Sequence, residues 1–304
     1  MKNIVLTGSS GFIGQNLCTY LKDKNYNIYS VSRGDLELKK GLSGFFNNDS
    51  QAGADVLIHL VGAAHGKFTN DAAEYINFDI TKKVIDRAVS LGISRFIYLS
   101  SAGVYMGCHG KVLSDTDLYY SELPNTMQSK LDAESYIKKL GLERGIEIVI
   151  IRCPLVYGSG VKGNFASLMA LVEKGWPLPV ALLNSNYKSL VSVRNLMDLI
   201  VTCIDHPKAA NETFLVSDDH DVSTSKMVRQ MAIALDKPTW QFPVPIWCYK
   251  LAGKLFGKSY MVERLVGSLQ VDITHTKQTL DWKPSQSLEE GFRQTAQALL
   301  NSKK

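Results

Sequence analysis

Short apolar runs alternate with longer amphipathic runs through the first half of the chain. The apolar runs are rich in Ile, Val and Leu, which is typical of strands buried on both faces of a parallel sheet. Strands are predicted over residues 1–6, 27–32, 55–61, 95–99 and 147–152. Helices are predicted over residues 15–21, 71–91 and 126–144. This alternation predicts an α/β fold with a Rossmann-type, doubly wound parallel sheet.

A glycine-rich turn joins the first predicted strand to the first helix. Its sequence is Thr7-Gly8-Ser9-Ser10-Gly11-Phe12-Ile13-Gly14. Glycines here would let the backbone approach a pyrophosphate, which would then lie at the positive end of the helix. The alternative is an ordinary turn, which glycines also serve. Because the turn stands between a strand and a helix, we predict a dinucleotide site. Its residues are Gly8, Ser10, Gly11, Phe12, Ile13 and Gly14.

The end of the second strand bears on the choice of cofactor. In such folds an acidic residue there usually binds the adenosine ribose hydroxyls of NAD. This strand ends in Ser32 and Arg33 instead. An arginine can hold a 2′-phosphate, so NADP is predicted, with NAD as the alternative if Arg33 is a solvated loop residue. The ends of two later strands are also expected to contact the cofactor, through Leu60, Val61, Gly62 and Cys153.

The pattern loosens after Pro154, where a smaller mixed lobe is expected. A short strand is predicted over residues 213–216, and helices over 164–174, 194–205, 223–235 and 288–300. We expect residues 1–157 to form the dinucleotide-binding domain, with part of 185–218 returning to it. Residues 158–304 are expected to form mainly the substrate-binding lobe, which closes over the crevice.

Composition narrows the function classes. The chain has 304 residues, 45% hydrophobic and 21% charged, which fits a globular enzyme of one or two domains. Its net charge of +5 comes from scattered lysines, so an anionic small ligand is expected and nucleic acid is not. Five scattered cysteines and six histidines without ligand-like spacing predict reduced thiols in a cytoplasm and no metal site. Neither a signal peptide nor an apolar run of ~20 residues is expected.

Five motifs follow one another in a recognisable order. They are Thr7-Gly8-x-x-Gly11-Phe-Ile-Gly14, Asp55-Val-Leu-Ile-His-Leu, Ser100-Ser101-x-x-Val104-Tyr105, Ser129-Lys130-x-x-Ala133-Glu134 and Arg152-Cys-Pro-Leu-Val-Tyr157-Gly158. This order resembles the extended short-chain dehydrogenase/reductase family of nucleotide-sugar epimerases, dehydratases and reductases. Segments 160–165, 186–196 and 267–272 narrow the resemblance to one branch. That branch includes UDP-glucose 4-epimerase-like proteins and the 4-keto-reductases that form UDP-N-acetyl-quinovosamine for surface polysaccharides.

The resemblance implies roles for individual residues. Ser101 matches the hydroxyl that hydrogen-bonds to the reacting sugar oxygen. Lys130 matches the lysine that binds the nicotinamide ribose and lowers the pKa of a nearby phenol, and Asn77 matches the helix asparagine of the site's framework. Contacts with a UDP-sugar are implied for Ser101, Tyr105, Asn164, Lys188 and Arg264. Ordinary surface or loop roles are the alternative for the last three. A homodimer is also implied.

One position departs from the family pattern. The catalytic motif is YxxxK, with the tyrosine four residues before the lysine on one helix face, but this chain has Thr126 before Lys130. A phenol titrates near ~10, within reach of a nearby cation, whereas an aliphatic hydroxyl titrates far higher. We therefore assign Ser101, Thr126 and Lys130 as the catalytic set, with proton transfer through solvent or a relayed hydroxyl.

Three functions remain open at this point. The first is an NADP(H)-dependent reductase of a UDP-4-keto-hexose, favoured because epimerisation must also remove the hydroxyl proton and so suffers more from the missing tyrosine. The second is a 4-epimerase of UDP-glucose or UDP-N-acetylglucosamine. The third is a catalytically impaired protein that binds nucleotide and acts as a sensor, for which Thr126 is the main argument.

The stretch 247–258 has an amphipathic pattern of another kind. Trp247, Leu251 and Leu255 share one helical face, and a neighbouring basic stripe is formed by Lys250, Lys254 and Lys258. Such a helix can rest on an anionic membrane surface. The alternative is that its apolar face packs inside the C-terminal lobe and the lysines are simply solvated.

Overall fold

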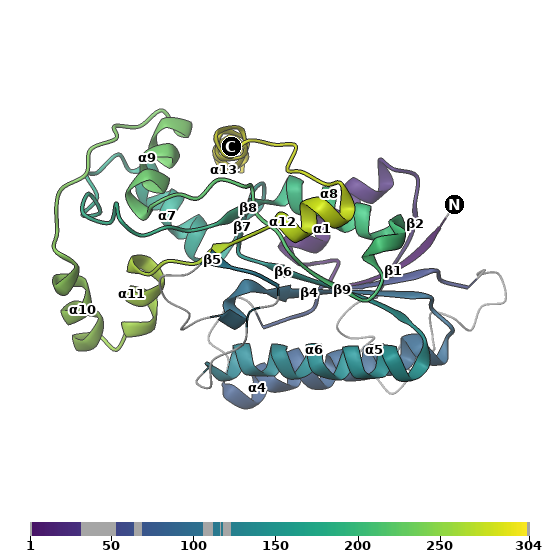
Figure 1. The fold of residues 1–304 in the computed structure, drawn as a ribbon. Coiled ribbons are helices and arrows are strands. Elements are labelled where there is room, and N and C mark those ends of the chain that lie inside the picture. Colours follow the sequence, from purple (N-terminus) through teal and green to yellow (C-terminus); the bar gives the residue numbers. More distant parts are fainter. Residues whose placement is uncertain are drawn as a thin grey trace.

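A parallel sheet of six strands forms the centre of the described structure (Figure 1). The structure is a computed structural model and describes residues 2–31, 53–63, 69–105, 112–115, 117 and 123–302. Across the sheet, the strands are β2 (Asn27–Val31), β1 (Asn3–Thr7), β3 (Val56–His59), β4 (Arg95–Ser101), β6 (Glu147–Cys153) and β9 (Glu212–Leu215). Every neighbouring pair is parallel. The predicted Rossmann-type α/β fold is therefore confirmed.

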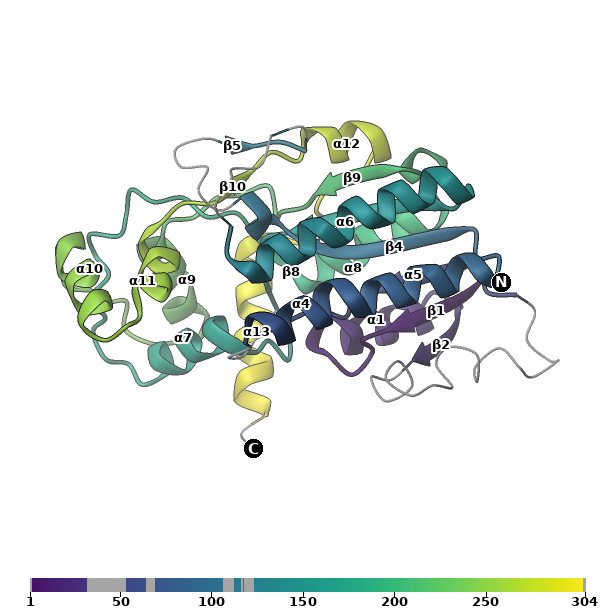
Figure 2. The same cartoon turned by 90° about the horizontal axis from the view of Figure 1, so that it is seen from below.

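Helices cover both faces of this sheet. On one face lie α4 (Asn70–Glu74), α5 (Ile80–Ser90) and α6 (Asn125–Arg144), which Figure 2 shows crossing in front of the strands. On the other face lie α1 (Phe12–Lys22), α8 (Val193–Asp205) and α12 (Thr274–Leu280) (Figure 1). Successive strand residues point to opposite faces, so Val5 joins the core beneath α5 and α6, and Ile4 joins the core beneath α1 and α8.

The predicted helix over 71–91 is confirmed, but its middle turn is wider than expected. The segment Tyr75–Asp79 is a π-helical turn between α4 and α5. Such turns are rare inside α-helices and often occur at functional sites. This one contains the buried Asn77.

A smaller lobe lies beyond the carboxyl ends of the strands. Its helices are α7 (Gly163–Glu173), α9 (Thr224–Ala234), α10 (Ile246–Leu255), α11 (Ser259–Val266) and α13 (Leu288–Asn301). Its paired strands are β7 (Leu155–Tyr157) with β8 (Leu190–Ser192), and β5 (Val112–Leu113) with β10 (Gln270–Val271). Tyr157, Phe165 and Phe292 stack at the centre of its core, with ring centroids 4.9 to 5.7 Å apart. Short 3-10 turns cover Ala102–Tyr105 and Pro207–Ala209.

The buried Asp218 ties the smaller lobe to the sheet. Its carboxylate accepts hydrogen bonds from the Ser192 backbone N–H at 2.8 Å, the Asn195 side-chain amide at 2.7 Å and the Tyr157 hydroxyl at 2.7 Å. Burial raises the pKa of this carboxyl group, and the three donors oppose that shift. Because β8 and α8 precede β9 of the sheet in the chain, this contact fixes the lobe against the six-stranded sheet.

Candidate active site

The glycine turn forms a tightly closed cradle between β1 and α1. Gly8 has a φ of +78°, and a Cβ there would lie 3.1 Å from the carbonyl carbon of Leu60. A Cβ at Gly14 would lie 2.2 Å from the Gly8 carbonyl oxygen, so no side chain fits at this position. The cradle is closed by a hydrogen bond of 3.1 Å from the Gly11 N–H to the Gly8 carbonyl. The glycines therefore allow the close packing of turn, strand and helix that a dinucleotide-binding turn requires.

The start of α1 completes this cradle. Ser10 and Gly11 are exposed, Ile13 is half-buried and Phe12 is buried in the core beneath the helix. Gly11 is the N-cap and no side chain caps the helix, so the first N–H groups are available to a ligand. The predicted residues of the turn therefore fit a dinucleotide pyrophosphate.

The end of β3 lies beside both the glycine turn and the predicted catalytic lysine. Leu60 and Val61 lie directly against Gly8. A Cβ at Gly62 would come within 2.9 Å of Lys130 Nζ and 3.5 Å of Asn77 Oδ1. Glycine at position 62 therefore leaves space for the Lys130 ammonium group between α6 and the π-helical turn that contains Asn77.

Asn77 fastens this strand end to the first turn of α6. Its Oδ1 accepts from the Ala63 N–H at 2.8 Å, and its Nδ2 donates at 3.1 Å to both the Thr126 carbonyl and Ser129 Oγ. These partners satisfy an amide that is completely buried. Asn77 therefore holds Thr126 and, one turn later, Lys130 in place beside β3.

Lys130 is a buried cation. Burial lowers the pKa of its ammonium group, whereas Cys153 and Glu134 raise it. Its Nζ lies 5.7 Å from the centroid of the Tyr98 ring, which favours the charged form. The buried Cys153 thiol has its pKa raised to about 11 by burial, so it remains neutral at physiological pH.

A buried histidine supports the same region and was not predicted. His59 bridges Thr7 and Thr81 through hydrogen bonds of 2.6 and 3.0 Å. Burial, with the nearby Lys130 charge, lowers the pKa of His59 to about 3, so the ring stays neutral. A polar residue within an otherwise apolar strand was the only sequence signal for it.

The end of β4 places Ser101 beside the first turn of α6. Ser101 is half-buried, and its Oγ accepts a hydrogen bond of 3.0 Å from the Gly103 N–H. A Cβ at Gly103 would lie 3.1 Å from Ser101 Oγ and 2.7 Å from the Met127 sulfur. The half-buried Thr126 precedes Met127 in the chain. Ser101 therefore lies at the end of β4, and the other two predicted catalytic residues, Thr126 and Lys130, lie on the first turns of α6, with Lys130 Nζ beside Gly62 after β3.

Tyr105 lies in a different environment from that expected of a substrate contact. It is buried, and its hydroxyl accepts from the Arg152 guanidinium, which is paired with the Glu134 carboxylate at 2.5 Å. Glu134 also accepts from Ser100 Oγ at 2.5 Å. Burial raises the pKa of the Tyr105 phenol. This network stabilises the joint between β4, β6 and α6, and it does not supply the phenol missing at position 126.

Lys188 and Arg264 lie together in the smaller lobe. Lys188 Nζ donates to the backbone carbonyls of Arg264 at 2.9 Å and Gly267 at 2.6 Å. Burial, together with repulsion from Arg264, lowers the pKa of Lys188 to about 8. Asn164 is exposed at the start of α7. Ser32 and Arg33, predicted to select the cofactor, lie outside the described residues.

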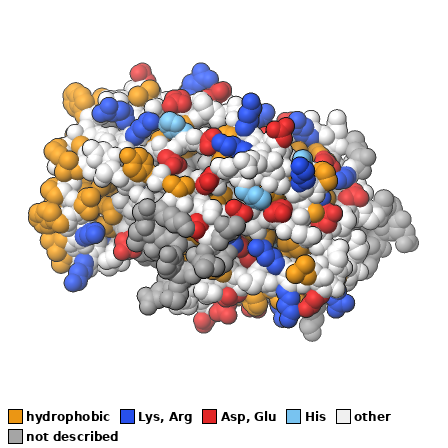
Figure 3. All heavy atoms as spheres, in the orientation of Figure 1, with side chains coloured by type: hydrophobic (Ala, Val, Ile, Leu, Met, Phe, Trp, Pro, Cys, Tyr) orange, Lys and Arg blue, Asp and Glu red, His pale blue; other side chains and the backbone are white. Residues whose placement is uncertain are grey.

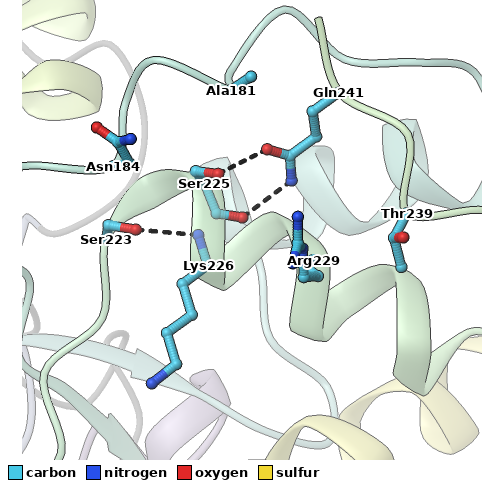
Figure 4. Close-up of a pocket in the computed structure, with 8 residues that line it drawn as sticks. All are labelled: Ala181, Asn184, Ser223, Ser225, Lys226, Arg229, Thr239 and Gln241. Carbon is cyan, nitrogen blue, oxygen red and sulfur yellow. Dashed lines mark hydrogen bonds between the residues drawn. The ribbon is translucent and has the colours of Figure 1, made fainter.

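A separate polar cavity of about 370 Å³ opens on the smaller lobe (Figure 4). It is lined by Ala181, Asn184, Ser223, Ser225, Lys226, Arg229, Thr239 and Gln241. Ser225 and Gln241 hydrogen-bond to each other across its wall, at 2.7 and 2.9 Å. None of the predicted cofactor or substrate residues lines this cavity. Over the residues that the structure describes, no group of three or more His, Cys, Asp or Glu is placed to hold a metal ion.

The family model of NAD-dependent epimerases and dehydratases matches residues 4–217 of this chain, more than half of its length. The chain belongs to the NAD-dependent epimerase/dehydratase family. Within it, the UDP-glucose 4-epimerase of Vibrio cholerae is 49% identical over 321 residues, covering 99% of this chain and 96% of the relative. The chain is thus a nucleotide-sugar enzyme that depends on NAD or NADP.

Two further family relatives are more distant. The N-acetyl-alpha-D-glucosaminyl-diphospho-ditrans,octacis-undecaprenol 4-epimerase of Escherichia coli O157:H7 is 25% identical over 287 residues, covering 86% of this chain and 82% of the relative. The crystal structure of the UDP-glucuronic acid 4-epimerase of Bacillus cereus with NAD has a TM-score of 0.77. It covers 99% of this chain and 100% of that chain at 17% identity, which supports the fold.

The prediction of a UDP-4-keto-sugar reductase is wrong in the light of these findings. The relative that is 49% identical over nearly the whole chain is a 4-epimerase. The reductase prediction was based on the missing phenol at position 126 and on Arg33. A missing phenol bears on which group moves the proton, but it does not determine whether the hydride comes from the sugar itself and returns to it or is consumed from a reduced cofactor.

Proposed function

We propose that this chain is a 4-epimerase of a UDP-hexose, with UDP-glucose and UDP-N-acetylglucosamine as the candidate substrates. The 49% identity to the Vibrio cholerae UDP-glucose 4-epimerase carries this proposal. The placement of Ser101 at the end of β4 and of Thr126 and Lys130 at the start of α6 supports it. When bound in the glycine cradle, NAD or NADP supplies the hydride acceptor and donor for C4.

The residues of the chain would handle the charge at the sugar oxygen. Ser101 Oγ would hydrogen-bond to the C4 oxygen, and the Lys130 ammonium would stabilise negative charge that develops there. Asn77 would position both helix residues through its bonds to the Thr126 carbonyl and to Ser129. With threonine at position 126, the proton would pass through that hydroxyl to solvent.

The reaction is tested by incubating the purified protein with each UDP-hexose and following the C4 epimers by proton NMR. Epimerisation is expected without net change in nicotinamide absorbance. In D₂O, the hydrogen at C4 is expected to be retained, because the same hydride leaves and returns. Net oxidation of NADPH by a UDP-4-keto sugar, without interconversion of C4 epimers, would contradict the proposal.

We propose NADP as the preferred cofactor, because Arg33 follows the second strand where an acidic residue would favour NAD. Arg33→Ala is expected to weaken NADPH binding by about 10- to 100-fold, the loss typical of a charged hydrogen bond. NADH binding is expected to stay unchanged and is the internal control. Titration calorimetry measures both, and equal affinities of the unmodified protein for NADH and NADPH would refute the prediction.

We further propose that Lys188 contacts the substrate diphosphate. Its ammonium is charged below a pKa of about 8 and loses that charge as the pH rises. The kcat/KM for the UDP-hexose is therefore expected to fall above about pH 8, while Lys188→Arg, which stays charged, is expected to remove this fall. Initial rates between about pH 6.5 and 9.5 test it. The same fall in both proteins would assign the titration to another group.

A second candidate substrate is a hexosamine joined through a diphosphate to a polyprenol. The name of the Escherichia coli O157:H7 relative describes a 4-epimerase that acts on such a polyprenol-linked sugar. The observation that favours it here is an exposed apolar surface on the smaller lobe, described in the next subsection. Comparing the rates on the UDP-linked and polyprenol-linked sugars distinguishes the two candidates.

We also propose a cytoplasmic location and a homodimer. Cys18, Cys153, Cys203 and Cys248 are free thiols in the structure, which suits a reducing compartment. Sedimentation equilibrium of the purified protein would test the dimer.

A further inference from the structure

The helical hairpin formed by α10 and α11 presents an apolar surface to solvent. Trp247, Leu251 and Leu255 are 65%, 50% and 73% exposed, and their spacing places them in one row along α10. Phe256 and Met261 continue the surface and are also exposed. Figure 3 shows hydrophobic side chains gathered at this end of the molecule. The alternative in which this face packs inside the lobe is therefore wrong.

The opposite side of the hairpin holds it in place. Gly253 is buried, and a Cβ there would lie 2.7 Å from a methyl group of Val262, so the two helices pack closely. Tyr249 and Leu265 pack against the core of the smaller lobe. Because this side makes the contacts with the protein, the row from Trp247 to Leu255 is held facing outward.

The segment that leads into α10 extends the apolar surface. It runs along the same end of the molecule, between α9 and α10 (Figure 1). Trp240 and Phe242 are both exposed on it. Its backbone is fixed, because Phe242 exchanges hydrogen bonds with Leu178 and Ala181 at 3.0 and 3.3 Å. An exposed apolar surface of this kind marks an interaction site rather than scattered surface residues.

The charge of this surface identifies its partner. Residues 237–266 contain four lysines and Arg264 against one acidic residue, Glu263. Lys250 and Lys254 are exposed one turn apart on α10, beside the apolar row, and Lys258 is exposed just before α11. In a two-fold dimer this surface would face the same surface of a second copy, so its lysines would meet a surface of the same positive charge. An anionic bilayer provides negative charge for the lysines and an apolar interior for the row between them.

We propose that α10, α11 and the segment 240–242 dock this enzyme on the surface of an anionic lipid bilayer. Tryptophans are favoured at the headgroup level, where Trp240 and Trp247 would lie. The contact is peripheral: over the part of the chain that the structure describes, no helix combines the length and apolar character needed to cross a bilayer.

The docked hairpin is part of the smaller lobe and contacts the segment that carries Lys188. Lys188 donates to carbonyls at the carboxyl end of α11 and just beyond it, at Arg264 and Gly267. Docking would therefore hold the segment with Lys188 close to the membrane. The inference does not depend on which sugar is the substrate, since it is tested by binding and not by turnover.

Flotation with vesicles tests this proposal. The unmodified protein is expected to float with vesicles of phosphatidylcholine and phosphatidylglycerol, and much less with phosphatidylcholine alone. The triple variant Lys250→Glu, Lys254→Glu, Lys258→Glu is expected to lower the partition coefficient by about 100-fold or more, from about five-fold per lysine. The matched control changes three exposed lysines elsewhere, Lys22→Glu, Lys208→Glu and Lys283→Glu, and has the same net charge.

The apolar row is tested in the same way. The double variant Leu251→Ser, Leu255→Ser is expected to abolish flotation, whereas the control Leu142→Ser, Leu300→Ser changes two exposed leucines elsewhere and is expected to float normally. Circular dichroism and the epimerase rate on a water-soluble UDP-hexose check that each variant is folded. Failure of the unmodified protein to float with anionic vesicles, or equal losses in test and control variants, would overturn the proposal. The proposal would also be overturned if the unmodified protein binds no vesicles and instead forms a dimer that the Leu251→Ser, Leu255→Ser variant converts to a monomer.

Discussion

Lys130→Met is expected to lower kcat/KM for the UDP-hexose by about 10²- to 10⁴-fold, the range typical of losing a group that stabilises charge or moves a proton in the transition state. Methionine fills a similar volume without the charge or the donors. Because the ammonium is buried and its desolvation opposes the charged form, this substitution is expected to leave the melting temperature unchanged or raised. Steady-state kinetics and thermal unfolding of the same preparation measure both effects.

A matched control for this experiment lies on the same helix. Lys138 is exposed on α6, two turns beyond Lys130, and Lys138→Met is expected to retain full activity. Cofactor affinity, measured by calorimetry, separates loss of ribose binding from loss of charge stabilisation. If Lys130→Met keeps activity within a few-fold of the unmodified enzyme, Lys130 is not part of the catalytic set.

Thr126→Tyr is expected to raise the turnover of the UDP-hexose, by up to about 10²-fold if proton transfer limits the rate. The new phenol would stand four residues before Lys130 on one face of α6, and the ammonium would lower its pKa. The helix turn that carries it is already fixed by Asn77 through the Thr126 carbonyl. Single-turnover measurements of C4 epimer formation report the chemical step directly.

Thr126→Phe is the control for the size of the new side chain. It introduces nearly the same ring without the hydroxyl, so it is expected to slow the enzyme or leave it unchanged. Thr126→Val removes the native hydroxyl at almost constant volume and is expected to slow turnover if that hydroxyl relays the proton. If the unmodified enzyme is already fast and both Thr126→Tyr and Thr126→Phe slow it, another residue transfers the proton and the assignment of Thr126 is wrong.

The sequence motifs indicated the kind of chemistry but not which reaction the protein catalyses. The motif around Lys130 indicated nicotinamide chemistry on a nucleotide sugar, and the family match confirms that class. Threonine at position 126 then suggested a reductase, but the 49% identical relative is a 4-epimerase. Both reactions move hydride at the same carbon. The distinction lies in whether the hydride comes from the sugar itself and returns to it or is consumed from a reduced cofactor, which no single residue of the motif records.

The sequence by itself determined the parallel sheet and the cofactor turn. Runs such as Ile4 to Leu6 and Ile148 to Ile151 are apolar throughout, because both faces of a central parallel strand are buried. The glycine spacing of the turn could also be recognised in the sequence, because a side chain at Gly14 would collide with the Gly8 carbonyl. Such features depend on residues close together in the chain, and their patterns are therefore visible without the fold.

Only the tertiary structure decided the partners of Asn77, the environment of Tyr105 and the exposure of α10. Asn77 contacts residues 14 and 49 positions away, at Ala63 and Thr126, and Tyr105 is buried against an arginine 47 positions away. The amphipathic pattern of 247–258 by itself was compatible with an apolar face turned into the lobe and with one turned out to solvent. Packing of Gly253 on Val262 settled this choice, because the side of a helix that contacts its neighbour determines which side remains exposed.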